Sequence, residues 1–119
     1  MDIVEFSNEY HDADDKIDQE HLNQVISRSI ESNLPDGYPR GHKNLIIVME
    51  ELAELSQEIS KEIRGTANYY NTLQELADVV LGIEYVKNIC FISDEELHKA
   101  MNVKLNRLER VLDKDGIYK

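Results

Sequence analysis

The sequence contains a single cysteine, Cys90, among its 119 residues. One cysteine cannot form a disulfide within the chain, and it cannot build a zinc site that needs several cysteine ligands. Positive charge is also scarce: 13 Lys and Arg residues stand against 24 Asp and Glu residues, which gives a formal net charge of −11. We therefore expect neither nucleic acid nor an anionic membrane surface as a partner, because both need clustered positive charge.

Long apolar runs are absent as well. No stretch is apolar enough over sufficient length to cross a bilayer, and no N-terminal basic and apolar segment indicates a secretion signal. Hydrophobic residues nevertheless make up 41% of the chain, which is too many for a disordered protein. We therefore expect a single folded domain, soluble and cytoplasmic.

The alternating pattern of a half-buried strand is also missing, and apolar residues recur instead at intervals of three and four. This periodicity predicts an all-α fold, an antiparallel four-helix bundle with short connections. Both prolines lie in residues 34–42, which we expect to form a loop. Residues 1–15 are acidic and poorly patterned, so we expect a lead-in or arm there. The expected helices span residues 16–33, 43–64, 68–91 and 94–113.

Local signals mark two of the helix ends. Gly65 and Thr66 are expected to end the second helix and start the turn to the third. Ser93 and Glu96 have the spacing of a capping box at the start of the fourth helix. The second helix carries a broad apolar stripe, much of which an isolated chain would expose, so we expect an oligomer. The stripe consists of Leu45, Val48, Leu52, Leu55, Ile59 and Ile63.

Two pairs of acidic residues interrupt the apolar pattern of the second and third expected helices. Glu51 and Glu54 are three residues apart, as are Glu75 and Asp78, so each pair lies on one side of its helix. The mean position of the four acids falls at the expected turn. An antiparallel hairpin that reverses there brings both pairs to the same level.

Four neighbouring carboxylates need a positive partner, because two like charges about 4 Å apart repel by about 4 kcal/mol at an effective dielectric constant near 20. Mg²⁺ prefers oxygen ligands and keeps coordination positions for water and phosphates. We therefore predict a site for Mg²⁺, with Mn²⁺ as the alternative ion, formed by Glu51, Glu54, Glu75 and Asp78. In a chain this acidic, the competing interpretation is a set of solvated surface carboxylates.

The fourth expected helix contributes two cations. Lys104 lies within an apolar sector and Arg107 at its edge, where they could reach a phosphate or the acids. A lysine that only covers apolar surface and a surface arginine are the competing interpretations. Arg40, His42 and Lys43 form a basic cluster near a helix N-terminus suited to anions, although such a cluster can also be plain surface.

The motifs EELAE, from Glu50, and ELADVV, from Glu75, followed by a lysine and an arginine on a fourth helix, resemble the all-α nucleoside triphosphate pyrophosphatases of the MazG type. The resemblance covers about residues 43–107. Members of that family convert a nucleoside triphosphate to its monophosphate and pyrophosphate with Mg²⁺, and related members form dimers or tetramers. The resemblance implies metal ligands at Glu51, Glu54, Glu75 and Asp78, and phosphate contacts at Lys104 and Arg107.

Many family members carry a lysine one turn before the first acidic motif. This chain has Ile47 there and Lys43 one turn earlier, so Lys43 is a further candidate for a phosphate contact. Glu54 lies at the edge of the acidic group and is our candidate for the general base that takes a proton from the attacking water. The family resemblance also implies a role in nucleotide house-cleaning or pool control.

Other functions share parts of this pattern. Phosphoribosyl-ATP pyrophosphatases and hydrolases specific for dUTP or dCTP use the same metal chemistry in the same superfamily. A non-catalytic helical interaction module would leave the four acids dispensable. A di-iron carboxylate bundle needs Glu-x-x-His pairs on two helices, and the single pair here, Glu95 and His98, lies away from the acids at the start of the fourth helix.

Overall fold

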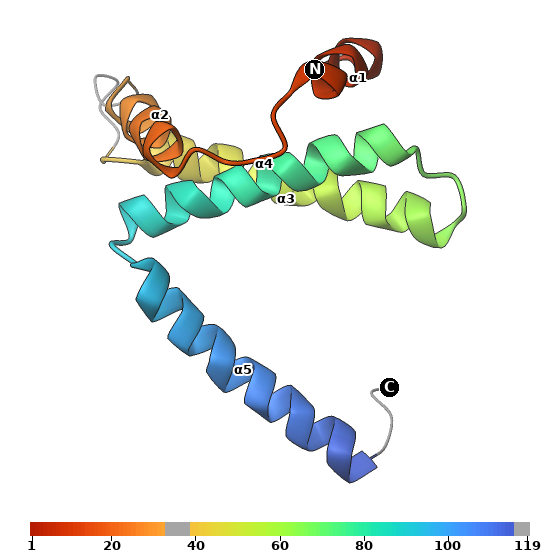
Figure 1. Cartoon of the computed structure of the whole chain (residues 1–119), viewed down its shortest axis with the longest axis vertical. Coiled ribbons are helices and arrows are strands. Elements are labelled where there is room, and N and C mark those ends of the chain that lie inside the picture. The colour runs from red at the N-terminus through yellow and green to blue at the C-terminus, as the bar shows by residue number, and fades with distance from the viewer. Residues whose placement is uncertain (33–38, 116–119) are drawn as a thin grey trace. The chain divides into compact units, whose positions relative to one another are not determined.

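Five α-helices make up most of the part of the chain that this computed structural model describes, residues 1–32 and 39–115 (Figure 1). No strand occurs within these two ranges, and the predicted all-α fold is confirmed. The chain divides into two compact units, the first ending at Ile89 and the second beginning at Cys90. The helices are α1 (Ile3–Asp12), α2 (Gln19–Ser32), α3 (His42–Ile63), α4 (Tyr69–Ile89) and α5 (Asp94–Asp115).

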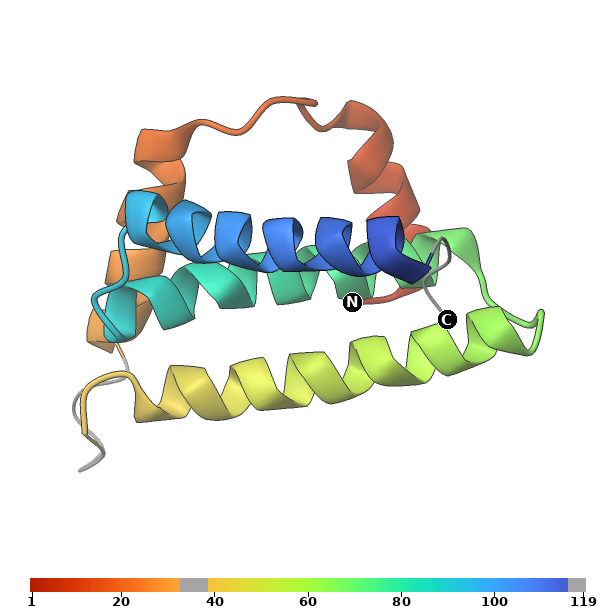
Figure 2. The same ribbon diagram turned by 90° about the horizontal axis from the view of Figure 1, so that it is seen from below.

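The first unit is built on an antiparallel hairpin of α3 and α4. Helix α4 lies between α3 on one side and α1 and α2 on the other (Figure 2). The chain reverses through Gly65, whose φ of 75° is readily adopted only by glycine, so the predicted end of the second helix is confirmed. The side chain of Asn68 then caps α4 by accepting the backbone N–H of Tyr70 at 3.0 Å.

Residues 1–15, which we expected to form a lead-in or arm, contain helix α1. Its ring contacts attach it to the start of α4, since the ring centroids of Tyr10 and Tyr70 are 5.9 Å apart. The Nε2 atom of Gln74 also donates to the carbonyl oxygen of Met1 at 3.1 Å. These contacts join residues far apart in the sequence, so the local apolar pattern could not indicate them.

The hydrophobic core of the described residues is small. Four hydrophobic side chains are buried, and the stripe predicted on the second helix is only partly covered. Within that stripe Val48 is buried, whereas Leu52 and Ile59 are each 50% exposed and Ile63 is 83% exposed. The buried hydrophobic residues are Ile26, Ile30, Val48 and Val79.

The connection from α2 to α3 is described only in part. Positions 33–38, which include the end of the first expected helix and most of the expected loop, lie outside the described residues. Residues 39–41 are not helical, and α3 begins directly after them at His42.

The second unit contains α5, which starts with the predicted capping box. The backbone N–H of Glu96 donates to Ser93 Oγ and the N–H of Ser93 donates to Glu96 Oε1, both at 3.1 Å. Hydrogen bonds to the Glu96 carboxylate from the Ser93 backbone N–H, and then from the Ser93 side chain, lower the pKa of Glu96 because they favour the ionised form. No helix in the described ranges is both long and apolar enough to cross a membrane.

Candidate metal centre

The hairpin of α3 and α4 determines where the four acids lie. Glu51 and Glu54 come from α3, and Glu75 and Asp78 come from α4. A close approach of the two helices lies about one turn away, where a Cβ atom added to Gly82 would lie 3.3 Å from both Val48 methyl carbons. This approach keeps the two acidic pairs within reach of one another.

The structure brings all four acids together, at the level that the position of the turn predicted. One carboxylate oxygen from each of the four residues lies within 4.8 Å of the others, and we call this group the acid cluster. Glu51, Glu75 and Asp78 are partly buried, whereas Glu54 is exposed. The cluster is therefore open to solvent on the side of Glu54.

The acid cluster holds its negative charge unfavourably. The pKa of Glu75 is raised to about 7, first by burial, then by a side-chain hydrogen bond with Glu54 and by repulsion from Glu54, Asp78 and Glu51, in that order. The pKa of Glu51 is raised as well, first by burial and then by the charge of Asp78. The Oε2 atom of Glu75 is buried and has no hydrogen-bond partner within the described chain. Protonation or a bound cation would relieve these strained carboxylates.

A hard divalent cation fits this set of donors. All four ligand atoms are carboxylate oxygens, the type that Mg²⁺ and Mn²⁺ prefer. Opposite oxygens around an octahedral Mg²⁺ lie about 4.2 Å apart, twice the usual Mg–O distance of about 2.1 Å. The cluster spans no more than 4.8 Å, so small side-chain movements suffice to bring its oxygens into the coordination sphere.

The predicted phosphate-binding residues are not part of the acid cluster. Lys43 is half-buried in the first turn of α3, eight residues before Glu51, which is about 12 Å along the helix. Lys104 and Arg107 are both exposed on α5, in the second unit. Their contact with a phosphate therefore stays a prediction.

A polar network that the sequence analysis did not identify joins α2 to the hairpin. The hydroxyl of Tyr85 donates to Ser29 Oγ at 2.8 Å, and Asn44 Nδ2 donates to the same atom at 3.3 Å. Asn44 and Tyr85 each lie seven residues from an acid of the cluster, so they share its side of the hairpin about 10 Å away. The sequence shows the interval of seven residues, but the hydrogen bonds to Ser29 could not be predicted without knowing where α2 packs.

Glu58 is a second feature that the sequence analysis did not identify. It follows Glu54 by one turn and is 7% exposed, although glutamate is seldom buried. Its Oε1 atom forms an ion pair with Lys61 at 3.0 Å, while its Oε2 atom has no hydrogen-bond partner within the described chain. Glu58 is not one of the four residues whose carboxylate oxygens lie within 4.8 Å of one another, so it is not part of the acid cluster.

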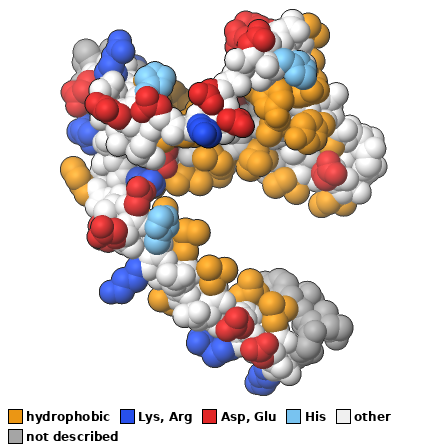
Figure 3. All heavy atoms as spheres, in the orientation of Figure 1, with side chains coloured by type: hydrophobic (Ala, Val, Ile, Leu, Met, Phe, Trp, Pro, Cys, Tyr) orange, Lys and Arg blue, Asp and Glu red, His pale blue; other side chains and the backbone are white. Residues whose placement is uncertain are grey.

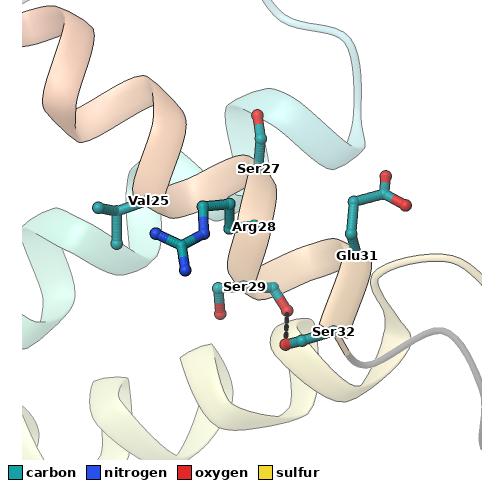
Figure 4. Close-up of a pocket in the computed structure, with 6 residues that line it drawn as sticks. All are labelled: Val25, Ser27, Arg28, Ser29, Glu31 and Ser32. Atoms are coloured by element: carbon teal, nitrogen blue, oxygen red, sulfur yellow. Dashed lines mark hydrogen bonds between the residues drawn. The ribbon is translucent and has the colours of Figure 1, made fainter.

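A pocket of about 840 Å³ lies along α2 (Figure 4). None of the residues that line it belongs to the acid cluster, and its charged groups, Arg28 and Glu31, have opposite signs. The hydroxyl of Ser32 donates to the backbone carbonyl of Ser29 at 2.8 Å. The lining residues are Val25, Ser27, Arg28, Ser29, Glu31 and Ser32.

Comparison of the chain with protein-family models found no match, and comparisons with curated proteins and with solved structures found no significant match. The likeness to MazG-type pyrophosphatases therefore rests on the motifs and on the arrangement of the acids alone.

Proposed function

We propose that this protein is a Mg²⁺-dependent nucleoside triphosphate pyrophosphohydrolase, which converts a nucleoside triphosphate and water to a monophosphate and pyrophosphate. The observation that carries the proposal is the acid cluster, whose four oxygens lie within 4.8 Å of one another. The buried Oε2 atom of Glu75, which has no hydrogen-bond partner within the described chain, gives further support. A surface carboxylate that is merely solvated would not have a buried oxygen without a hydrogen-bond partner.

Within this proposal Glu51, Glu54, Glu75 and Asp78 hold the cation. When bound, Mg²⁺ or Mn²⁺ would supply positive charge that offsets the triphosphate and favours attack by water on a phosphorus atom. The carboxylates fix the reacting groups in one place, which removes much of the entropy cost of bringing them together.

Glu54 is the member of the cluster best situated to accept a proton. Its side chain is exposed, whereas the other three are partly buried, so it can meet a water molecule that approaches from solvent. We assign it the role of general base, taking the proton of the attacking water as the new oxygen–phosphorus bond forms. Gln at this position would keep the size and remove the basic group.

Lys104 and Arg107 are the proposed phosphate contacts, with Lys43 as a third candidate. They lie three residues apart, so both project from one side of α5. A lysine and an arginine on one side can offset the charge that develops on the leaving pyrophosphate, the arginine with two parallel hydrogen bonds. We further propose a cytoplasmic homodimer or homotetramer of antiparallel helical bundles that acts in nucleotide house-cleaning or pool control.

The test is a panel of ribo- and deoxynucleoside triphosphates incubated with the protein and Mg²⁺ or Mn²⁺, with pyrophosphate and orthophosphate measured separately. We expect metal-dependent release of pyrophosphate and monophosphate that is lost in Glu75→Gln. The control is Glu62→Gln, which removes one exposed carboxylate of α3 outside the cluster and should retain activity.

Two results would count against the proposal. Release of orthophosphate in place of pyrophosphate would mean that the bond cleaved is a different one. No turnover of any nucleotide by a folded protein would favour the non-catalytic interaction module.

A further inference from the structure

Aromatic rings gather where α1 meets the start of α4, and all of them belong to the first unit. Three of the rings, those of Tyr10, His11 and Tyr70, meet edge to face, with centroids 5.8 to 6.2 Å apart in each pair. Figure 3 shows hydrophobic side chains, a class that includes tyrosine, between α1 and the start of α4. We call this group the aromatic cluster. It consists of Phe6, Tyr10, His11, Tyr69 and Tyr70.

The aromatic cluster lies close to the acid cluster along α4. Tyr70 precedes Glu75 by five residues, which is about 7.5 Å of helix, on the side of the turn. Aromatic side chains are the groups on which proteins stack nucleobases. In a nucleotide only the sugar separates the base from the phosphates, so a base held at Tyr70 leaves its phosphates near the acids.

Glu58 provides a buried oxygen atom at the same end of the acid cluster. It follows Glu51 by seven residues, which places it on the same side of α3 and nearer to the turn. Its side chain is buried, at 7% exposure, and Lys61 pairs with its Oε1 atom at 3.0 Å. Its Oε2 atom has no hydrogen-bond partner within the described chain.

Gln74 provides a second such oxygen atom, between the two clusters. It directly precedes Glu75 and follows Tyr70 by four residues, so it shares a side of α4 with that ring. Its Nε2 atom donates to the carbonyl oxygen of Met1 at 3.1 Å, which fixes the amide with its oxygen at the other end. That oxygen, Oε1, is buried and has no hydrogen-bond partner within the described chain.

The two unpaired atoms specify the chemistry of the missing partner. Both are acceptors, and a buried acceptor without a donor is costly, so the partner must bring hydrogen-bond donors. An amino group on a nucleobase carries two N–H bonds, and a glutamate carboxylate can accept from the amino group of cytosine. A keto oxygen in the same place would add a third acceptor.

The opposite end of the acid cluster does not have this property. There the hydroxyl of Tyr85 and the side-chain amide of Asn44 both donate to Ser29 Oγ. These three polar side chains already bind one another, whereas the acceptors of Glu58 and Gln74 are left over. The end next to the aromatic cluster is therefore the better site for a base.

We propose that the aromatic cluster, Glu58 and Gln74 bind the base of the nucleotide and select a base with an amino group on carbon 4 of a pyrimidine or carbon 6 of a purine. The base stacks on the rings, and its amino group donates to Glu58 Oε2 and Gln74 Oε1. This inference rests on the proposed function for the nature of the substrate, but the selection between bases is a property of these residues alone.

Calorimetric titration of the full chain in Mg²⁺ tests the selection without any turnover. The probes are the α,β-methylene analogues of CTP and UTP, whose bases differ at carbon 4 and which cannot be cleaved between the first two phosphates. The wild-type chain should bind the CTP analogue at least tenfold more tightly. Glu58→Gln should reduce this ratio below threefold, because an amide can also donate to a keto oxygen. The control Glu62→Gln alters an exposed carboxylate of α3 and should keep the ratio.

A second pair of variants tests the rings independently of Glu58. Tyr70→Leu removes the ring and should weaken binding of both analogues at least tenfold, whereas Tyr70→Phe keeps the ring and should retain binding. Affinity for Mn²⁺ in the absence of nucleotide should be unchanged in both variants and in Glu58→Gln, because none of these residues belongs to the acid cluster.

Three results would overturn the inference: equal binding of the two analogues by the wild type, a preference that Glu58→Gln leaves intact, or weaker Mn²⁺ binding in Glu58→Gln, which would assign its oxygen to a cation. Release of pyrophosphate from CTP and UTP at equal rates would likewise overturn it while supporting the proposed function. Preferential binding of the CTP analogue without release of pyrophosphate from CTP would support the base site and count against the proposed reaction alone.

Discussion

Gly82 on α4 lies so close to Val48 on α3 that a Cβ atom at position 82 would be 3.3 Å from both methyl carbons of the valine. Val48 is buried and β-branched, so it has little freedom to move aside. The missing side chain at position 82 therefore sets the distance between the two helices that carry the acid cluster.

Enlarging residue 82 should force the helices apart and weaken the metal site. We expect Gly82→Ala to change the free energy of unfolding by less than about 1 kcal/mol, because the better helix propensity of alanine offsets the tight contact. Gly82→Leu should destabilise the protein by about 2 kcal/mol or more through overpacking. Urea unfolding measures both, and Ala53→Leu at an exposed position of α3 is the control.

The effect of Gly82→Leu on metal binding distinguishes a change in the geometry of the metal site from a change in the overall stability of the protein. If the close approach holds the acidic pairs together, the increase in melting temperature caused by Mg²⁺ should shrink in Gly82→Leu and persist in Gly82→Ala. An undiminished increase in the leucine variant would show that the pairs do not depend on this contact.

The stability of the metal-free protein should depend on pH through Glu75. Its pKa is about 7 in the folded chain, above the ordinary value of 4.5 for a glutamate, so between these values the folded state holds a proton that the unfolded state has released. Stability therefore falls as pH rises from about 4.5 to 7 and changes little through this group above that. Ionisation of Glu75 should lower the unfolding free energy by on the order of 1 to 2 kcal/mol, because its partial exposure to solvent reduces the full effect of the pKa shift.

Urea unfolding at pH 5 and pH 7.5 with EDTA present measures this dependence. Glu75→Gln cannot ionise, so the variant should lose less stability than the wild type over that interval. Some dependence should remain because the pKa of Glu51 is raised as well. If the unfolding free energy changed by the same amount between these two pH values in the variant and in the wild type, Glu75 would not be a source of the pH dependence.

The hydrogen bond from Tyr85 to Ser29 should stabilise the attachment of α2 to the hairpin. Tyr85→Phe removes the donor of this 2.8 Å bond and should cost about 1 kcal/mol of unfolding free energy. A double-mutant cycle with Ser29→Ala isolates the interaction. A coupling energy near zero would show that the bond makes no net contribution.

Lys104 and Arg107 should affect substrate binding without affecting the metal site. If they contact phosphates, Lys104→Ala and Arg107→Ala should each lower kcat/KM at least tenfold while the affinity for Mn²⁺ stays unchanged. The matched control is Lys99→Ala, another exposed lysine of α5. A loss of Mn²⁺ affinity in either variant would instead indicate a structural role near the acids.

Much of the helical structure in both units could be predicted from the sequence because it follows from local rules. The intervals of three and four predicted an all-α fold, Gly65 marked the turn, and the capping box of Ser93 and Glu96 formed as expected. The acid cluster could also be predicted, since two pairs at equal distance from a turn must meet in an antiparallel hairpin.

The features that were missed depend on contacts between distant residues. Helix α1 is attached through the rings of Tyr10 and Tyr70, and nothing in the pattern of residues 1–15 indicates that contact. Nothing in the sequence around Ser29 indicates that Tyr85 and Asn44 both donate hydrogen bonds to its hydroxyl oxygen. The apolar stripe of α3 was expected, but periodicity cannot tell a stripe covered by the same chain from one left exposed.

The most direct test of the central claim is a titration with Mn²⁺, in which binding is measured by the loss of the electron paramagnetic resonance signal of the free ion. We predict that the wild-type chain binds Mn²⁺, that Mg²⁺ competes, and that Glu75→Gln weakens binding at least tenfold while Glu62→Gln does not. Equal binding by all three proteins would contradict the account, because the acid cluster would then be no more than a group of neighbouring carboxylates.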